Sequence, residues 1–117
     1  MKKDQAVAAL AALAQDNRLD VFRLLVQAGP DGMPAGRVAE ALGLAPNTLT
    51  FHFDRLRDAG LVTVRRDGRS MIYAARFETM NGLLGFLTEN CCQGAPHACA
   101  PANVCKPARG RRAKVSA

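Results

Sequence analysis

The stretch VAEALGLAPNTLTFHFDRLRDAG, residues 38–60, carries the clearest indication of the fold. Apolar residues recur at helical spacing on both sides of Gly-Leu-Ala-Pro, residues 43–46. Gly43 suits the position just after a helix, and Pro46 suits the first position of the next helix. The pattern predicts two short helices, residues 35–42 and 46–57, joined by a tight turn, which is a helix-turn-helix.

Further helices are expected on both sides of this motif, and a hairpin follows it directly. The expected helices outside the motif are residues 4–15, 17–28 and 77–90. Asp16 or Asn17 suits the N-cap of the second of the five helices. Asp67-Gly68 is a two-residue hairpin signal between strands at residues 61–66 and 69–74. The predicted fold is mainly α with a β-hairpin (α+β), a winged helix-turn-helix of order ααααββα.

The positive charge is concentrated at the C-terminal end. The net charge is +6, and the basic residues of the last dozen are Lys106, Arg109, Arg111, Arg112 and Lys114. We expect a folded domain over residues 1–92, and a cysteine-containing loop with a disordered basic tail over residues 93–117. The tail either neutralises DNA phosphates without sequence preference or only keeps the chain soluble. No apolar run reaches membrane-spanning length and the start does not resemble a signal peptide, so we expect a cytoplasmic protein.

Polar and basic side chains are expected on the outward side of helix 46–57. They are Asn47, Thr48, Thr50, His52 and Arg55. Such groups suit hydrogen bonds to phosphates and base edges. The arginines around the hairpin tip, where a wing can reach DNA backbone or a minor groove, are Arg65, Arg66 and Arg69. The combination predicts binding to double-stranded DNA. The alternative is a solvated helix face, with His52 as an ordinary surface or capping histidine.

Residues 5–92 resemble the ArsR/SmtB family of metal-responsive repressors. The matching stretches are residues 16–25, 38–44, 47–53, 56–62 and 66–69. The resemblance implies a homodimer whose first and last helices form the interface, with two recognition helices reading a palindromic operator. The apolar stripes on these helices are Val7, Leu10 and Ala14, and Met80, Leu83, Leu84 and Leu87. They suit that interface, but taken alone they also suit an intramolecular core.

Two metal sites of this family are not expected here. The last helix has Glu78 and Glu89 but no histidine, so the family's zinc site on that helix is missing. The helix before the turn has no cysteine, which removes one type of arsenic site.

The four cysteines lie together near the C-terminus. They are Cys91, Cys92, Cys99 and Cys105. The adjacent pair with a third cysteine shortly after it resembles the arsenic-binding branch of the family. Trivalent arsenic takes three sulfurs, and thiolates are the soft ligands it selects. The resemblance implies a repressor that responds to As(III) and requires no cofactor. In it, the adjacent pair and Cys99 bind the arsenic. Cys105 is an auxiliary or spare thiol, or it replaces one of the three.

Several other roles for these thiols stay open. Antimonite takes three sulfurs, as arsenite does, whereas methylarsenite needs only two. Cadmium or lead also accepts thiolates, and zinc could use His97 with Cys92, Cys99 and Cys105. A thiol redox switch and inert thiols are the remaining alternatives. An enzyme is not expected, because no nucleophile–base constellation is visible and the only serines are Ser70 and Ser116.

Overall fold

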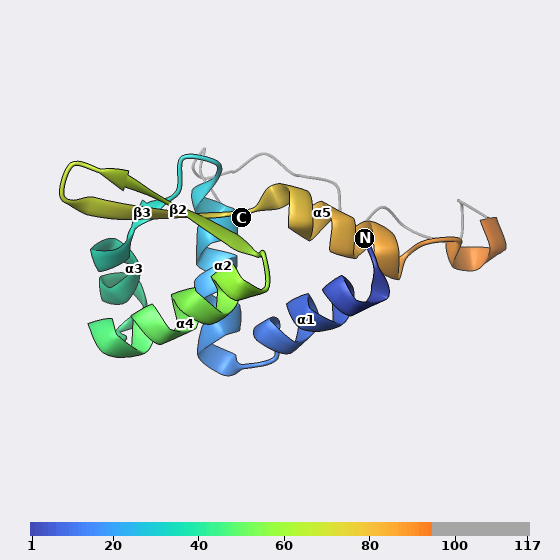
Figure 1. Cartoon of the computed structure of the whole chain (residues 1–117), viewed down its shortest axis with the longest axis horizontal. Coiled ribbons are helices and arrows are strands. Elements are labelled where there is room, and N and C mark those ends of the chain that lie inside the picture. Colours follow the sequence, from blue (N-terminus) through green and yellow to red (C-terminus); the bar gives the residue numbers. More distant parts are fainter. Residues whose placement is uncertain (95–117) are drawn as a thin grey trace, which may run out of the picture. The chain divides into compact units, whose positions relative to one another are not determined.

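The computed structural model describes residues 1–94 of the chain (Figure 1). The chain divides into two units, Met1–Leu87 and Thr88–Ala117. The division comes before the predicted boundary after Cys92. Helix α5, Phe77–Leu87, ends three residues before the predicted Asn90, which instead adopts a left-handed φ of 58°. Within residues 1–94, none of the helices combines the length and the apolar character that crossing a membrane requires.

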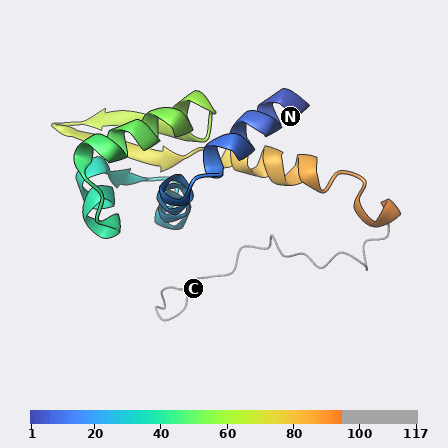
Figure 2. The ribbon, with the colours of Figure 1, turned by 90° about the horizontal axis from the view of Figure 1, so that it is seen from below.

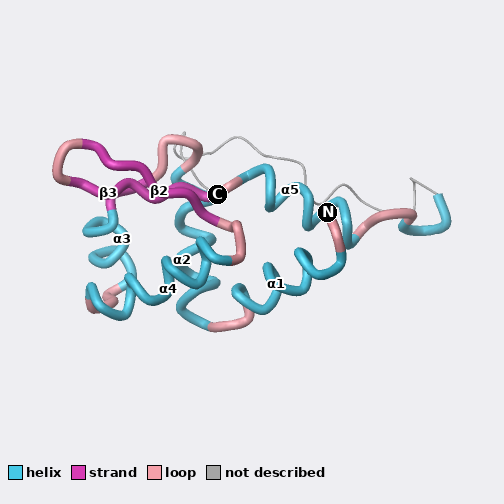
Figure 3. The backbone as a smooth tube through the Cα atoms, in the orientation of Figure 1, coloured by secondary structure: helices cyan, strands magenta, loops and turns pink. Residues whose placement is uncertain are grey.

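The first unit contains five helices and a three-stranded antiparallel sheet (Figures 1 and 3). Its other helices are α1 Lys3–Leu13, α2 Asp16–Ala28, α3 Ala35–Leu42 and α4 Pro46–Asp58. Its strands are β1 Met33–Pro34, β2 Val62–Asp67 and β3 Ser70–Ala75. The predicted order of helices and hairpin is confirmed. Strand β1 was not predicted, because a strand of two residues has too few positions to show an alternating pattern.

Two of the predicted helix-end residues are confirmed, and the predicted N-cap of α2 is not. Gly43 ends α3 in the left-handed region at φ 65°, and Pro46 is the first residue of α4, both as predicted. The predicted N-cap of α2, Asp16 or Asn17, was wrong. Gln15 holds that position, and its side-chain oxygen accepts a hydrogen bond from the Arg18 backbone N–H at 2.9 Å. The longer amide side chain of Gln15 therefore caps this helix, a role that the shorter Asp or Asn usually fills.

The hairpin turn lies one residue later than predicted. Asp67 still pairs with Ser70 across the two strands, so the turn residues are Gly68 and Arg69 rather than Asp67 and Gly68. Gly68 has φ 64°, whereas Arg69 is not among the residues with positive φ. Glycine at the first turn position alone is the pattern of a type II′ turn. The shift moves Arg69 from a strand into the tip of the wing.

Strand β3 lies at the centre of the sheet, in the order β1-β3-β2. Tyr73 pairs with Val64 on one side and with Met33 on the other. On the face of the sheet toward α4, the Tyr73 ring stacks on Phe53, with centroids 3.6 Å apart and planes 5° from parallel. Aromatic burial of this kind is a large contribution to a small core. It fixes α4 against the wing.

Helices α1 and α5 contact each other (Figure 2). The fully buried residues of α1 are the small side chains Ala6, Ala9 and Ala12, and Leu13 at its end packs half-buried against the core. By contrast, Val7 and Leu10 are 59% and 43% exposed. These two larger side chains therefore lie outside the core of the subunit.

The apolar stripe of α5 is divided between core and surface. Leu83 is buried and Met80 is half-buried, whereas Leu84 and Leu87 are exposed. The inner part of the stripe thus belongs to the intramolecular core. The outer part, like Val7 and Leu10 of α1, does not.

Candidate nucleic-acid interface

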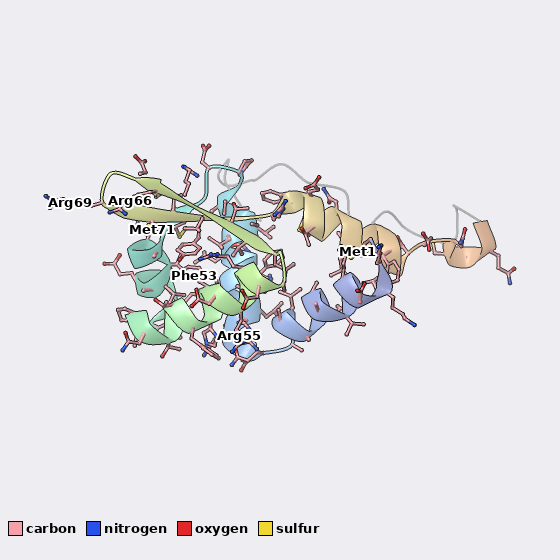
Figure 4. All side chains as sticks on the ribbon, viewed as in Figure 1. Met1, Phe53, Arg55, Arg66, Arg69 and Met71 are labelled. Atoms are coloured by element: carbon pink, nitrogen blue, oxygen red, sulfur yellow. The ribbon has the colours of Figure 1, made fainter. Side chains whose placement is uncertain are left out.

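One side of α4 is anchored in the core and the opposite side is exposed. Leu49, Phe53 and Leu56 are the anchoring apolar residues, each at most 2% exposed. The exposed polar residues of α4 that were predicted to face outward are Asn47, Thr48, Thr50 and Arg55. Arg55 points away from the sheet (Figure 4). This arrangement leaves a helix of 13 residues with its polar side free to enter a groove.

The hydroxyl of Thr50 is already used within the helix. Its Oγ1 donates a hydrogen bond to the Pro46 carbonyl oxygen at 3.0 Å. The proton is therefore not available to a phosphate, while the methyl group and both lone pairs of the oxygen remain. The hydrogen-bond donors at the start of this face are then the side chains of Asn47 and Thr48.

His52 does not lie on the outward side, so its predicted placement was wrong. The side chain is only 4% exposed, and its Nδ1 lies 3.4 Å from Nη1 of Arg18. Arg18 also donates from Nε to the Ala12 carbonyl oxygen at 2.7 Å. His52 thus belongs to a junction between α1, α2 and α4. Burial, and then the positive charge of Arg18, lower the pKa of His52.

The lowered pKa of His52 predicts a pH-dependent stability. Below the imidazole's ordinary pKa of about 6.5 the unfolded chain takes up a proton that folded His52 does not, so stability falls with falling pH. It stops falling below the lowered pKa, and the slope stays under about 1.4 kcal/mol per pH unit. Urea unfolding at pH 7.5 and 5.5 measures it. Between pH 7.5 and pH 5.5, His52→Gln is expected to lose less stability than the wild type. The control, His97→Gln, is expected to lose as much stability as the wild type. Equal losses for wild type and His52→Gln would contradict this.

The wing arginines have different local partners. Arg65 Nη2 donates to the Asp31 carbonyl oxygen at 3.1 Å and so ties the wing to the segment before β1. Arg66 Nε donates to the Gly68 carbonyl oxygen at 3.3 Å, within the hairpin. Arg66 and Arg69 lie at the far end of the hairpin (Figure 4). All three are exposed, and Arg65 also has a structural role that was not predicted.

Phe51 is an exposed residue of α4 that sequence reasoning missed. Its side chain is 51% exposed, and the Arg55 guanidinium carbon lies 5.1 Å from the ring centroid. The rings of Phe51 and His52 meet edge to face, with centroids 5.7 Å apart. The available signal was its spacing, because position 51 falls between the buried positions 49 and 53 and so faces away from them.

Two of the four predicted arsenic ligands lie within the described residues. Cys91 is half-buried and Cys92 is exposed, in the irregular turn η1, Cys91–Gly94. Cys92 and Gln93 have left-handed φ values of 54° and 53°. Cys99, Cys105 and the alternative zinc ligand His97 lie outside the described residues. Residues 1–94 contain no group of three His, Cys, Asp or Glu side chains that could hold a metal ion.

Comparisons with known proteins agree with this geometry. The family described as "Helix-turn-helix domain" matches residues 13–65. HTH-type transcriptional regulator YgaV of Escherichia coli (strain K12) is 30% identical over 89 residues, which cover 76% of this chain and 88% of YgaV. The crystal structure of NolR from Sinorhizobium fredii has 31% identity and a TM-score of 0.59, covering 74% of this chain and 83% of NolR.

A third similar protein is a homodimer in solution. It is the homodimeric winged helix-turn-helix DNA-binding domain of Mb0332 from Mycobacterium bovis, described as a possible ArsR-family transcriptional regulator. It has 27% identity and a TM-score of 0.60, covering 74% of this chain and 81% of that domain. With this fold and these relatives, the chain belongs to the ArsR-like family of winged helix-turn-helix transcriptional regulators.

Proposed function

We propose that this regulator is an arsenic(III)-responsive repressor, which binds operator DNA as a homodimer and is released when arsenic binds its C-terminal thiolates. The observation that carries the sensing half is the adjacent pair Cys91–Cys92, which follows the last helix of the domain and has an exposed thiol at Cys92. Exposed thiolates are the ligands that a soft, thiophilic ion selects. The exposed polar side of α4 and the arginine-bearing wing support the DNA-binding half.

The donor set fits a trivalent arsenical. The pair supplies two sulfurs, which is enough for methylarsenite. Arsenite or antimonite needs a third, which Cys99 supplies in this proposal, with Cys105 as an auxiliary thiol or its replacement. The left-handed residues at Cys92 and Gln93 keep this segment out of a regular helix, in which consecutive side chains diverge by about 100°. The two cysteine side chains are therefore not held at the divergence that a regular helix would impose.

The exposed apolar residues of α1 and α5 support a dimer through the first and last helices. Val7 and Leu10 on α1, and Leu87 on α5, are each at least 43% exposed. Apolar side chains gathered on contacting helices typically mark a protein interface. A second copy of the chain is the occupant we propose, since a relative of 27% identity is a homodimer. Such a dimer presents two copies of α4, one to each half of a palindromic operator.

Release requires that arsenic binds the DNA-free dimer more tightly than the DNA-bound dimer. Couplings between two sites are typically about 1–3 kcal/mol, which changes operator affinity by about 5- to 150-fold. The thiols themselves need not touch DNA, so their removal is expected to abolish release and to leave operator binding intact.

Fluorescence anisotropy of the full-length protein on its own promoter DNA tests the proposal. Under reductant, arsenite, methylarsenite, antimonite, cadmium and zinc are titrated in parallel. We expect release at stoichiometric arsenite or antimonite, and we expect Cys91→Ser and Cys92→Ser to bind DNA with unchanged affinity but to resist release. Cys105→Ser is the matched control and is expected to remain releasable if Cys99 is the third ligand.

Three outcomes would contradict the arsenic assignment. Full release of both serine variants by arsenite would place the site elsewhere. Release by cadmium or zinc alone would make this a sensor of another soft metal. Release by peroxide that a reductant reverses, together with no response to arsenicals, would make it a thiol redox switch.

A further inference from the structure

A phenyl group stands on the side of α4 that faces away from the core. Phe51 is 51% exposed, whereas Leu49 and Phe53 on either side of it in sequence are at most 2% exposed. Its neighbours on the outer side of the helix are the polar residues Asn47 and Thr48. The core of the subunit does not require an aromatic ring here, because the side chain points away from it. Aromatic side chains are enriched where proteins contact a partner, and this one is exposed on the side of α4 that is proposed to meet DNA.

The ring is held by neighbouring side chains. The Arg55 guanidinium lies over it, with the carbon 5.1 Å from the centroid, in a cation–π contact. The His52 ring meets it edge to face, and His52 is itself fixed by burial and by Arg18 at 3.4 Å. These contacts restrict the rotation of a side chain that is otherwise free in solvent. Phe51 therefore has a defined direction before any partner binds.

The major groove offers such a ring one apolar group. Base edges there present hydrogen-bond donors and acceptors, except for the 5-methyl group of thymine. A phenyl group pressed against a polar edge would strip water from it without supplying a hydrogen bond, which is unfavourable. Against a methyl group it removes apolar surface from water, which is favourable. Phe51 thus has the chemistry to prefer thymine over the other bases.

We propose that Phe51 is a specificity-determining residue that contacts the 5-methyl group of one thymine in each operator half-site. The inference rests on the proposed function, in which α4 enters the major groove. Arg55 acts as a positioning residue for the ring. The two threonines on the same face, Thr48 and Thr50, also carry methyl groups, and the experiment separates them from Phe51.

The test replaces thymine by deoxyuridine, which pairs identically and lacks only the methyl group. The full-length protein first selects its operator from random duplexes, and each thymine is then replaced in turn, symmetrically in both half-sites. We expect one position at which the wild type loses about fourfold in affinity per half-site, or about 15-fold for both, as for one buried methyl group. Phe51→Ala is expected to bind the thymine and deoxyuridine operators equally.

A matched variant separates base reading from general affinity. Arg69→Ala, at the wing tip, is expected to weaken binding to both operators and to keep their ratio. Thermal unfolding of Phe51→Ala is expected to match the wild type, since the ring lies outside the core. Equal binding of the wild type to every deoxyuridine operator would overturn the role of Phe51, as would an unchanged ratio in Phe51→Ala. Failure to select any operator would overturn the proposed DNA-binding function as well.

Discussion

Replacing Val7 and Leu87 together by Glu is expected to dissociate the dimer and to weaken operator binding by at least about 100-fold, because two linked half-site contacts become one. The two side chains are 59% and 56% exposed in the single subunit, so the double variant keeps its own core. In the dimer that we propose, the same side chains are buried against a second copy. Carboxylates there would have to lose their water without gaining a partner, which is strongly unfavourable.

Sedimentation equilibrium and operator anisotropy measure the two effects separately. For the sedimentation measurement, Met71→Glu is the matched control, because Met71 is 41% exposed but lies on the wing rather than on α1 or α5. It is expected to remain dimeric. A double variant that stays dimeric at micromolar concentration would show that the interface uses another surface. A monomeric variant that still binds its operator at full affinity would contradict the palindromic mode of binding.

Replacing Gly32 by Ala is expected to lower the free energy of unfolding by about 2–4 kcal/mol, through a left-handed backbone and an overpacked site. Gly32 has φ +77°, which an L side chain rarely adopts. A Cβ there would also collide with the backbone carbonyl of Tyr73 and would press on Ala74. The backbone oxygen belongs to the central strand, so it cannot move aside without disturbing the pairing of β1 and β2 with β3.

Gly43→Ala separates the two causes. Gly43 has a similar φ of +65°, but nothing lies within 4 Å of an added Cβ, so only the backbone cost of about 1–2 kcal/mol is expected. Urea unfolding is compared at one protein concentration, because dimerisation raises apparent stability. If the two variants lose equal stability, the close approach of Gly32 to Tyr73 does not constrain the fold.

Helix α4 shows which side-chain positions a residue pattern predicts and which it misses. The spacing of Leu49, Phe53 and Leu56 predicts which side of α4 is buried, and the exposed polar residues on the other side follow from it. Polarity alone misplaces His52 on the outward side. It lies three residues after Leu49 and four before Leu56, which places it on the buried side. Side-chain type likewise misses Phe51, because an apolar residue is expected in the core although its position faces outward.

Local patterns were sufficient for most of the secondary structure. The helices, the turn between α3 and α4 and the existence of the hairpin are governed by interactions between residues close in sequence. Gly43 and Pro46 act through their own backbone preferences, so their positions were predictable. The cysteines near the C-terminus predict a soft-metal site, which stays a prediction, because Cys99 and Cys105 lie outside the described residues.

Residue patterns were thus enough to predict the class of fold and the order of its elements. The packing of the elements shows, beyond any such pattern, that β1 pairs with β3, that Arg18 lies beside His52, and that Val7 is exposed while Ala9 is buried. These features join residues distant in the chain, or depend on which side of a helix finds a partner. Their energies arise from packing between elements, which no local pattern of residues contains.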